Sequence, residues 1–117
     1  MKTYLQKGSN SLLIINQKTS KKVLVSDVIL LEGHINYTTF HLQNGSKKVV
    51  AHSIKFFEPY LQTQGFLRTH RSFMINPTHV KTYNKLEEIL TMSNGRKAFI
   101  SRRKKRSVEN HLNFSNN

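Results

Sequence analysis

Two Asn-Gly pairs, Asn44-Gly45 and Asn94-Gly95, constrain the fold of this chain more than any other feature. Each pair lies between two runs rich in β-branched and aromatic residues, and Asn-Gly is the strongest short-range signal for a β-hairpin. The expected strands are 37–42 with 47–52, and 88–92 with 97–101. The sequence therefore predicts a chain built mostly from antiparallel strands.

Each hairpin also implies a register. If both Asn-Gly pairs form two-residue turns, aromatic and β-branched side chains lie opposite each other, which stabilises a sheet. The expected pairs are Phe40 with Val49, Leu90 with Phe99, and Ile89 with Ile100. Further strands are expected at 12–17, 23–25, 66–69 and 79–83. The continuous apolar run 28–31 is typical of a strand that is buried on both faces.

Two short helices are expected. In the first, over 53–61, Ser53 is placed to cap the N-terminus, and Ile54, Phe57 and Leu61 share one face. Pro59 lacks the N–H that would bond to the preceding turn, so about two turns with a kink are predicted. A second helix is expected over 104–112.

Charge indicates the class of partner. The 117 residues include 19 Lys and Arg but only 6 Asp and Glu, which gives a net charge of +13, and residues 96–106 hold seven basic side chains and no acidic one. Such a surface favours phosphate polyanions. No apolar run is long enough to cross a membrane, and the absence of cysteine is compatible with the cytoplasm. One domain is expected over 10–112, with an extension at 1–9 and a frayed tail at 113–117.

Catalytic and metal-binding patterns are weak. Glu87 and Glu88 would point to opposite faces of a strand, and His41 and His52 have no evident third ligand. All five glycines are isolated, so there is no phosphate-binding loop. We therefore expect no enzyme, no cofactor, no metal and no small-molecule substrate.

Three loops, 33–37, 69–72 and 101–105, are the candidates for binding nucleic acid. Arg71 precedes the apolar run 73–75, and Arg102 follows another apolar strand, so both side chains should reach solvent and could contact guanine. The alternative for Arg71 is an ion pair with Glu58 or Glu87. His70 is as readily a hydrogen-bonded framework residue as a contact.

The segment Phe66-Leu-Arg-Thr-His-Arg-Ser-Phe-Met-Ile-Asn76 resembles the central signature of the LytTR family of bacterial DNA-binding domains. Other family features follow in order: the apolar strand in 25–32, the short helix before Phe66, and Phe99-Ile-Ser-Arg102. The resemblance covers roughly 10–112. Family members often carry a receiver domain as well, and the first ten residues could not supply one. The chain is therefore either a stand-alone member or a domain cut from a longer protein, and Met1 favours the stand-alone regulator.

The resemblance implies an elongated all-β fold of three small antiparallel sheets with a short helix. It also implies loops that enter successive major grooves of double-stranded DNA, usually at paired direct repeats, where two copies of the protein could associate. The implied base contacts are Arg71, Arg102 and Asn36. The expected backbone contacts are Arg68, Ser72, Tyr37, Ser101, Arg103, Lys104 and Lys105. Two histidines, His70 and His34, could be either structural residues or contacts.

Two other classes of protein suit a charge of +13. A basic protein that binds RNA or the ribosome would present stacked aromatic residues on an open sheet, and no such pair is evident in the expected strands. A module that binds an acidic protein would not distinguish between nucleic acids. Sequence-specific binding of double-stranded DNA by a transcription regulator is the function expected.

Overall fold

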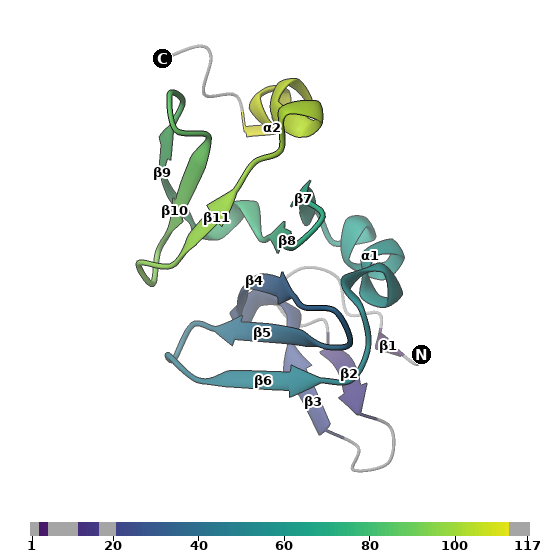
Figure 1. Cartoon of the computed structure of the whole chain (residues 1–117). Helices are drawn as coiled ribbons and strands as arrows, with labels where there is room; N and C mark the ends of the chain where they lie inside the picture. Colours follow the sequence, from purple (N-terminus) through teal and green to yellow (C-terminus); the bar gives the residue numbers. More distant parts are fainter. Residues whose placement is uncertain (1–2, 5–11, 17–20, 113–117) are drawn as a thin grey trace.

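The computed structural model describes residues 3–4, 12–16 and 21–112, and these residues form three antiparallel sheets with two short helices (Figure 1). The principal extents of the molecule are 43 × 30 × 25 Å. The predicted fold class, an elongated and mostly β chain of small antiparallel sheets, is confirmed.

The first sheet contains β1 (Thr3–Tyr4), β2 (Leu12–Asn16) and β3 (Lys21–Leu24). The second has the order β6-β5-β4-β8-β7, and its strands are β4 (Val28–Gly33), β5 (Thr38–Leu42), β6 (Lys47–Val50), β7 (Leu67–His70) and β8 (Phe73–Ile75). The third contains β9 (Val80–Asn84), β10 (Ile89–Met92) and β11 (Lys97–Phe99). Residues 3–4, expected within an N-terminal extension, pair with β2. The expected tail 113–117 lies outside the described residues.

Strand β4 lies between two hydrophobic clusters, as its continuous apolar sequence predicts. Val28 and Leu31 pack in one cluster with residues of the first sheet and of helix α1 (Ile54–Thr63). Ile29 and Leu30 pack in the other with residues of the third sheet and of helix α2 (Lys105–Leu112). In Figure 1, β4–β6 occupy the lower half of the molecule, β9–β11 the upper half, and β7 and β8 lie between them.

The predicted registers of both Asn-Gly hairpins are wrong by one residue. Phe40 lies opposite Lys48 rather than Val49, because residues 43–45 form a three-residue loop. In this loop the Leu42 N–H donates to the Ser46 carbonyl (2.9 Å), and the Gly45 N–H donates to the Leu42 carbonyl (3.0 Å). Gly45 alone has a positive φ, 89°, which is the pattern of a type I turn followed by a glycine bulge.

The second hairpin has the same loop. Met92 bonds to Arg96 across residues 93–95, and Gly95 has a φ of 86°. Leu90 therefore faces Ala98, and Ile89 faces Phe99. Strand β10 also begins one residue later than predicted, because Glu88 belongs to the preceding turn and has a φ of 58°.

Helix α1 confirms the predicted buried face of Ile54, Phe57 and Leu61. Ser53 occupies the N-cap position without a side-chain capping bond, and the helix continues beyond Pro59 to Thr63. Helix α2 agrees with the expected helix over 104–112, and its Val108 packs in the second cluster.

Candidate nucleic-acid interface

The turn between β7 and β8 joins the other two candidate loops through backbone hydrogen bonds. On one side, the Gly33 N–H donates to the Ser72 carbonyl (2.8 Å). On the other side, the Ser101 N–H donates to the Thr69 carbonyl (2.8 Å), and the Thr69 hydroxyl donates to the Phe99 carbonyl (2.9 Å). The three loops selected from the sequence are therefore neighbours, with Arg71 in the middle one.

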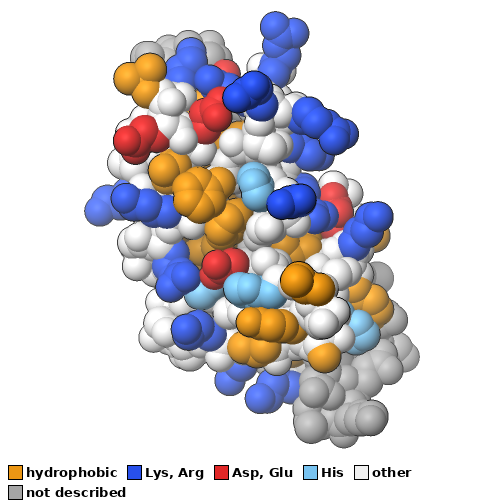
Figure 2. All heavy atoms as spheres, in the orientation of Figure 1, with side chains coloured by type: hydrophobic (Ala, Val, Ile, Leu, Met, Phe, Trp, Pro, Cys, Tyr) orange, Lys and Arg blue, Asp and Glu red, His pale blue; other side chains and the backbone are white. Residues whose placement is uncertain are grey.

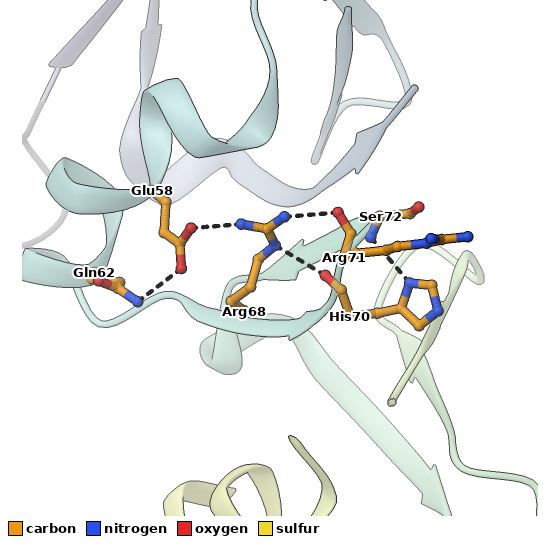
Figure 3. Close-up of polar contacts among 6 residues, drawn as sticks. All are labelled: Glu58, Gln62, Arg68, His70, Arg71 and Ser72. Carbon is orange, nitrogen blue, oxygen red and sulfur yellow. Dashed lines mark hydrogen bonds and ion pairs between the residues drawn. The ribbon is translucent and has the colours of Figure 1, made fainter. Parts of the chain in front are cut away.

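Arg68 holds the β7–β8 turn in shape. Its Nε donates to the His70 carbonyl (2.9 Å), and its Nη2 donates to the Arg71 carbonyl (2.7 Å). Its Nη1 forms an ion pair of 2.5 Å with Glu58 of α1, which also accepts a hydrogen bond from Gln62 (3.2 Å) (Figure 3). The alternative expected for Arg71 was an ion pair with Glu58 or Glu87. In the structure it is Arg68 that pairs with Glu58.

Arg71 itself is exposed, and its side chain extends away from the Arg68–Glu58 pair. The neighbouring His70 accepts a hydrogen bond at Nδ1 from the Ser72 N–H (3.0 Å), so its neutral ring carries a proton on Nε2. Burial lowers the pKa of His70, and the charges of Arg71 and Arg68 lower it further. His70 is therefore a hydrogen-bonded framework residue through Nδ1, which is one of the two roles expected from the sequence.

The β4–β5 loop is a tight hairpin. Pairing continues beyond the strands, because the His34 N–H donates to the Tyr37 carbonyl (2.8 Å), which leaves Ile35 and Asn36 at the tip. The His34 ring stacks on Tyr37 with centroids 4.4 Å apart. All four side chains are exposed. The tip faces a groove whose other walls are the start of α1 and the β7–β8 turn, and the basic residues lining the groove are Lys55, Arg68 and Arg71.

The third loop begins at Ser101, whose hydroxyl accepts a hydrogen bond from the Lys104 N–H (3.3 Å) and so caps the 3-10 turn Arg102–Lys104. This cap leaves Arg102 and Arg103 exposed. Lys105 is half-buried and pairs with Glu88 (3.5 Å). Of the five predicted contacts in this loop, the two arginines are therefore the most accessible.

One exposed aromatic residue in the interface was not selected from the sequence. The side chain of Phe99 is 49% exposed, whereas that of Ile100 is 4% exposed. The Phe99 ring lies beside His70 and Phe73, with centroid distances of 6.5 and 5.6 Å. The alternation of Ala98 and Phe99 in β11 with Ile100 just after it was the available signal, but this pattern does not tell which face is covered.

Basic side chains surround this region. In Figure 2, Lys and Arg side chains border a band in which hydrophobic and His side chains gather. Glu32, beside the β4–β5 hairpin, bonds to the buried His41 (3.1 Å) and to Arg96 (3.3 Å), so its charge is partly compensated. The surface offers cationic donors to an anion, together with apolar groups.

The part of the chain that the structure describes contains neither a metal-binding cluster nor a membrane-spanning helix. No group of three or more His, Asp or Glu side chains there is placed to hold a metal ion. None of the described helices has the length and apolar character needed to cross a membrane.

Comparisons with known proteins agree with the sequence signature. The family model described as the LytTr DNA-binding domain matches residues 18–113. No curated protein matches the chain. A solved structure from Bacillus cereus, the LytTr DNA-binding domain of a putative methyl-accepting/DNA response regulator, is similar with a TM-score of 0.70 and 28% identity, over 80% of this chain and 88% of that chain. The chain therefore belongs to the LytTR family of DNA-binding domains.

Proposed function

We propose that this protein is a bacterial transcription regulator that binds specific double-stranded DNA sequences by placing loops in the major groove. The observation that carries the proposal is the bonding of the β7–β8 turn to both neighbouring loops, which places the loops that carry Arg71, Asn36 and Arg102 next to one another. The net charge of +13 would provide the sequence-independent attraction to phosphates.

The three proposed base contacts have suitable chemistry and exposure. Arg71 and Arg102 can each donate two hydrogen bonds to O6 and N7 of guanine, and Asn36 can bond to N6 and N7 of adenine. All three side chains are exposed. Backbone hydrogen bonds hold the loops that carry these residues, so less backbone entropy would be lost on binding than for free loops, while the exposed side chains would still have to be ordered.

The remaining predicted residues would contact the DNA backbone. We assign Ser72, Tyr37, Ser101, Arg103, Lys104 and Lys105 to this group. Arg68 would combine this contact with a structural role. Its side chain already donates to two carbonyls of the β7–β8 turn and to Glu58, so only its remaining N–H groups are available to a phosphate. His34 would act mainly by stacking on Tyr37. His70 holds Ser72 through Nδ1 and would present its Nε2 proton to the DNA.

We further propose that two copies bind paired direct repeats on DNA in the cytoplasm. A charge of +13 on each copy opposes association in free solution, whereas DNA phosphates would neutralise much of that repulsion. Association would therefore be detectable mainly on DNA that carries both sites.

Selection from a randomised duplex library with the purified protein, near physiological salt, tests the proposal. Enrichment of a short motif, repeated in the same orientation at helical spacing, is the expected result. Recovery of DNA without any motif would contradict sequence-specific binding and favour a general basic RNA- or ribosome-associated protein. Lys105→Ala should weaken binding to all sequences alike and reduce the slope of log K against log salt by up to about 1.

A further inference from the structure

The side chain of Ile35 is 94% exposed at the tip of the β4–β5 hairpin. The backbone at the tip has no positive φ, so the turn does not itself require Asn, Asp or Gly, and the exposed side chain of Ile35 adds no packing to the fold. This apolar side chain is therefore fully available for contact with a partner.

The surroundings of Ile35 place it within the proposed interface. The His34–Tyr37 backbone bond and the stacked rings of these two residues close the hairpin just below the tip. Ile35 lines the same groove as Asn36 and Arg71, both proposed base contacts. An apolar side chain is thus presented between hydrogen-bonding ones.

We propose that Ile35 contacts the C5 methyl group of a thymine in the major groove, an inference that rests on the proposed function. The thymine methyl is the apolar feature of the major-groove edge, and apolar side chains recognise it. Contact would remove both the methyl group and the isoleucine side chain from water. Asn36 and Arg71 would recognise neighbouring bases by hydrogen bonding.

Leu86 provides a matched control. Its side chain is 96% exposed in the turn between β9 and β10, so it has the same aliphatic character and exposure as Ile35. It does not line the groove that contains Arg71. Single exposed apolar residues are common on protein surfaces. Comparing Ile35 with Leu86 therefore distinguishes the effect of a place in the groove from the effect of exposure alone.

The test uses the selected operator with each thymine replaced in turn by deoxyuridine, which removes only the methyl group. For the unmodified protein, at least one replacement should weaken binding roughly fourfold, the ratio expected for one methyl group. Ile35→Ala should weaken binding to thymine DNA, and the same deoxyuridine replacement should then have little further effect. Leu86→Ala should retain the full thymine dependence, and both variants should keep the melting temperature of the parent protein.

Two results would overturn the inference while leaving the proposed function intact. One is an operator whose binding is unaffected by every deoxyuridine replacement. The other is an Ile35→Ala protein that keeps the full thymine dependence, whether or not its binding is weaker on both DNAs. Failure to select any operator would instead overturn the proposed function itself.

Discussion

Arg68 and Arg71 lie three residues apart, yet their guanidinium groups have different surroundings. Arg68 is bonded to Glu58 and to two backbone carbonyls of the turn, whereas Arg71 is exposed. The two arginines should therefore respond differently to substitution. Loss of Arg71 should affect DNA contacts directly, and loss of the support around Arg68 should act through the shape of the turn.

Arg71→Ala should weaken binding to the selected operator by about 1–3 kcal/mol and relax the preference at one base position. Arg71→Lys keeps the charge but replaces the planar guanidinium fork with one flexible ammonium group, so it should lose part of the specificity while keeping non-specific affinity. Fluorescence anisotropy with operator and scrambled duplexes measures both effects. Unchanged affinity and preference in Arg71→Ala would show that this residue is not a base contact.

Glu58→Gln should weaken operator binding even though it removes a negative charge. The reason is that Arg68 loses its carboxylate partner, so the β7–β8 turn is held less firmly. Glu87→Gln is the control, because it makes the same change of charge on an exposed residue outside the interface. Simple electrostatics predicts slightly tighter binding for both variants, and equal behaviour of the two would argue against a positioning role for Glu58.

At the scale of elements, Gly33 connects β4 to α1 and to the β7–β8 turn. A Cβ atom at Gly33 would lie 2.7 Å from Cδ1 of Ile54, which is far inside van der Waals contact. The Gly33 N–H also bonds to Ser72, so any shift of this backbone would move the interface. A side chain at this position would therefore require the buried Ile54 side chain to shift.

Gly33→Ala should destabilise the fold by about 1–3 kcal/mol, the usual effect of overpacking a core. Ile54→Val removes the nearest atom, so the double variant should recover part of that loss, although Ile54→Val alone costs about 0.5–1.5 kcal/mol. Urea unfolding of the parent protein, the two single variants and the double variant measures the coupling free energy between Gly33 and Ile54. Strictly additive effects would mean that the two side chains do not clash.

Sequence reasoning identified most elements but not their finer pairing. The buried run in β4 and the apolar face of α1 follow from patterns of several residues, and both are confirmed. Asn-Gly predicts a hairpin but suits both a two-residue turn and a three-residue loop with a glycine bulge, so the registers were wrong. The Glu58–Arg68 pair depends on how α1 packs beside β7, which no local pattern encodes.

At the scale of the molecule, buried histidine should make stability depend on pH. Burial is the main cause that lowers the pKa of His41, with a further contribution from Arg96 and Lys47, while its contacts with Glu32 oppose the shift. The unfolded chain then takes up a proton before the folded protein does as the pH falls. Stability is therefore complete above the ordinary histidine pKa of about 6.5 and is lost as the pH falls toward the lower folded value.

Urea unfolding between pH 8 and pH 5 should show this loss, with a slope of at most about 1.4 kcal/mol per pH unit from one histidine. His41→Gln should lower stability at pH 8 but flatten the dependence below pH 6.5. An unchanged slope in this variant would assign the dependence to other groups, of which His70 is the next candidate because its pKa is lowered too.

On the proposed function, the backbone bonds that join the β7–β8 turn to Gly33 and Ser101 would also restrict the spacing of the bases that the protein recognises. Successive base pairs are about 3.4 Å apart along the duplex, and one turn takes about 10 base pairs. Loops that cannot slide relative to one another fix the number of base pairs between their contacts. One base pair inserted inside a half-site should therefore abolish specific binding, whereas many insertions between two half-sites should be accommodated by flexure of the DNA.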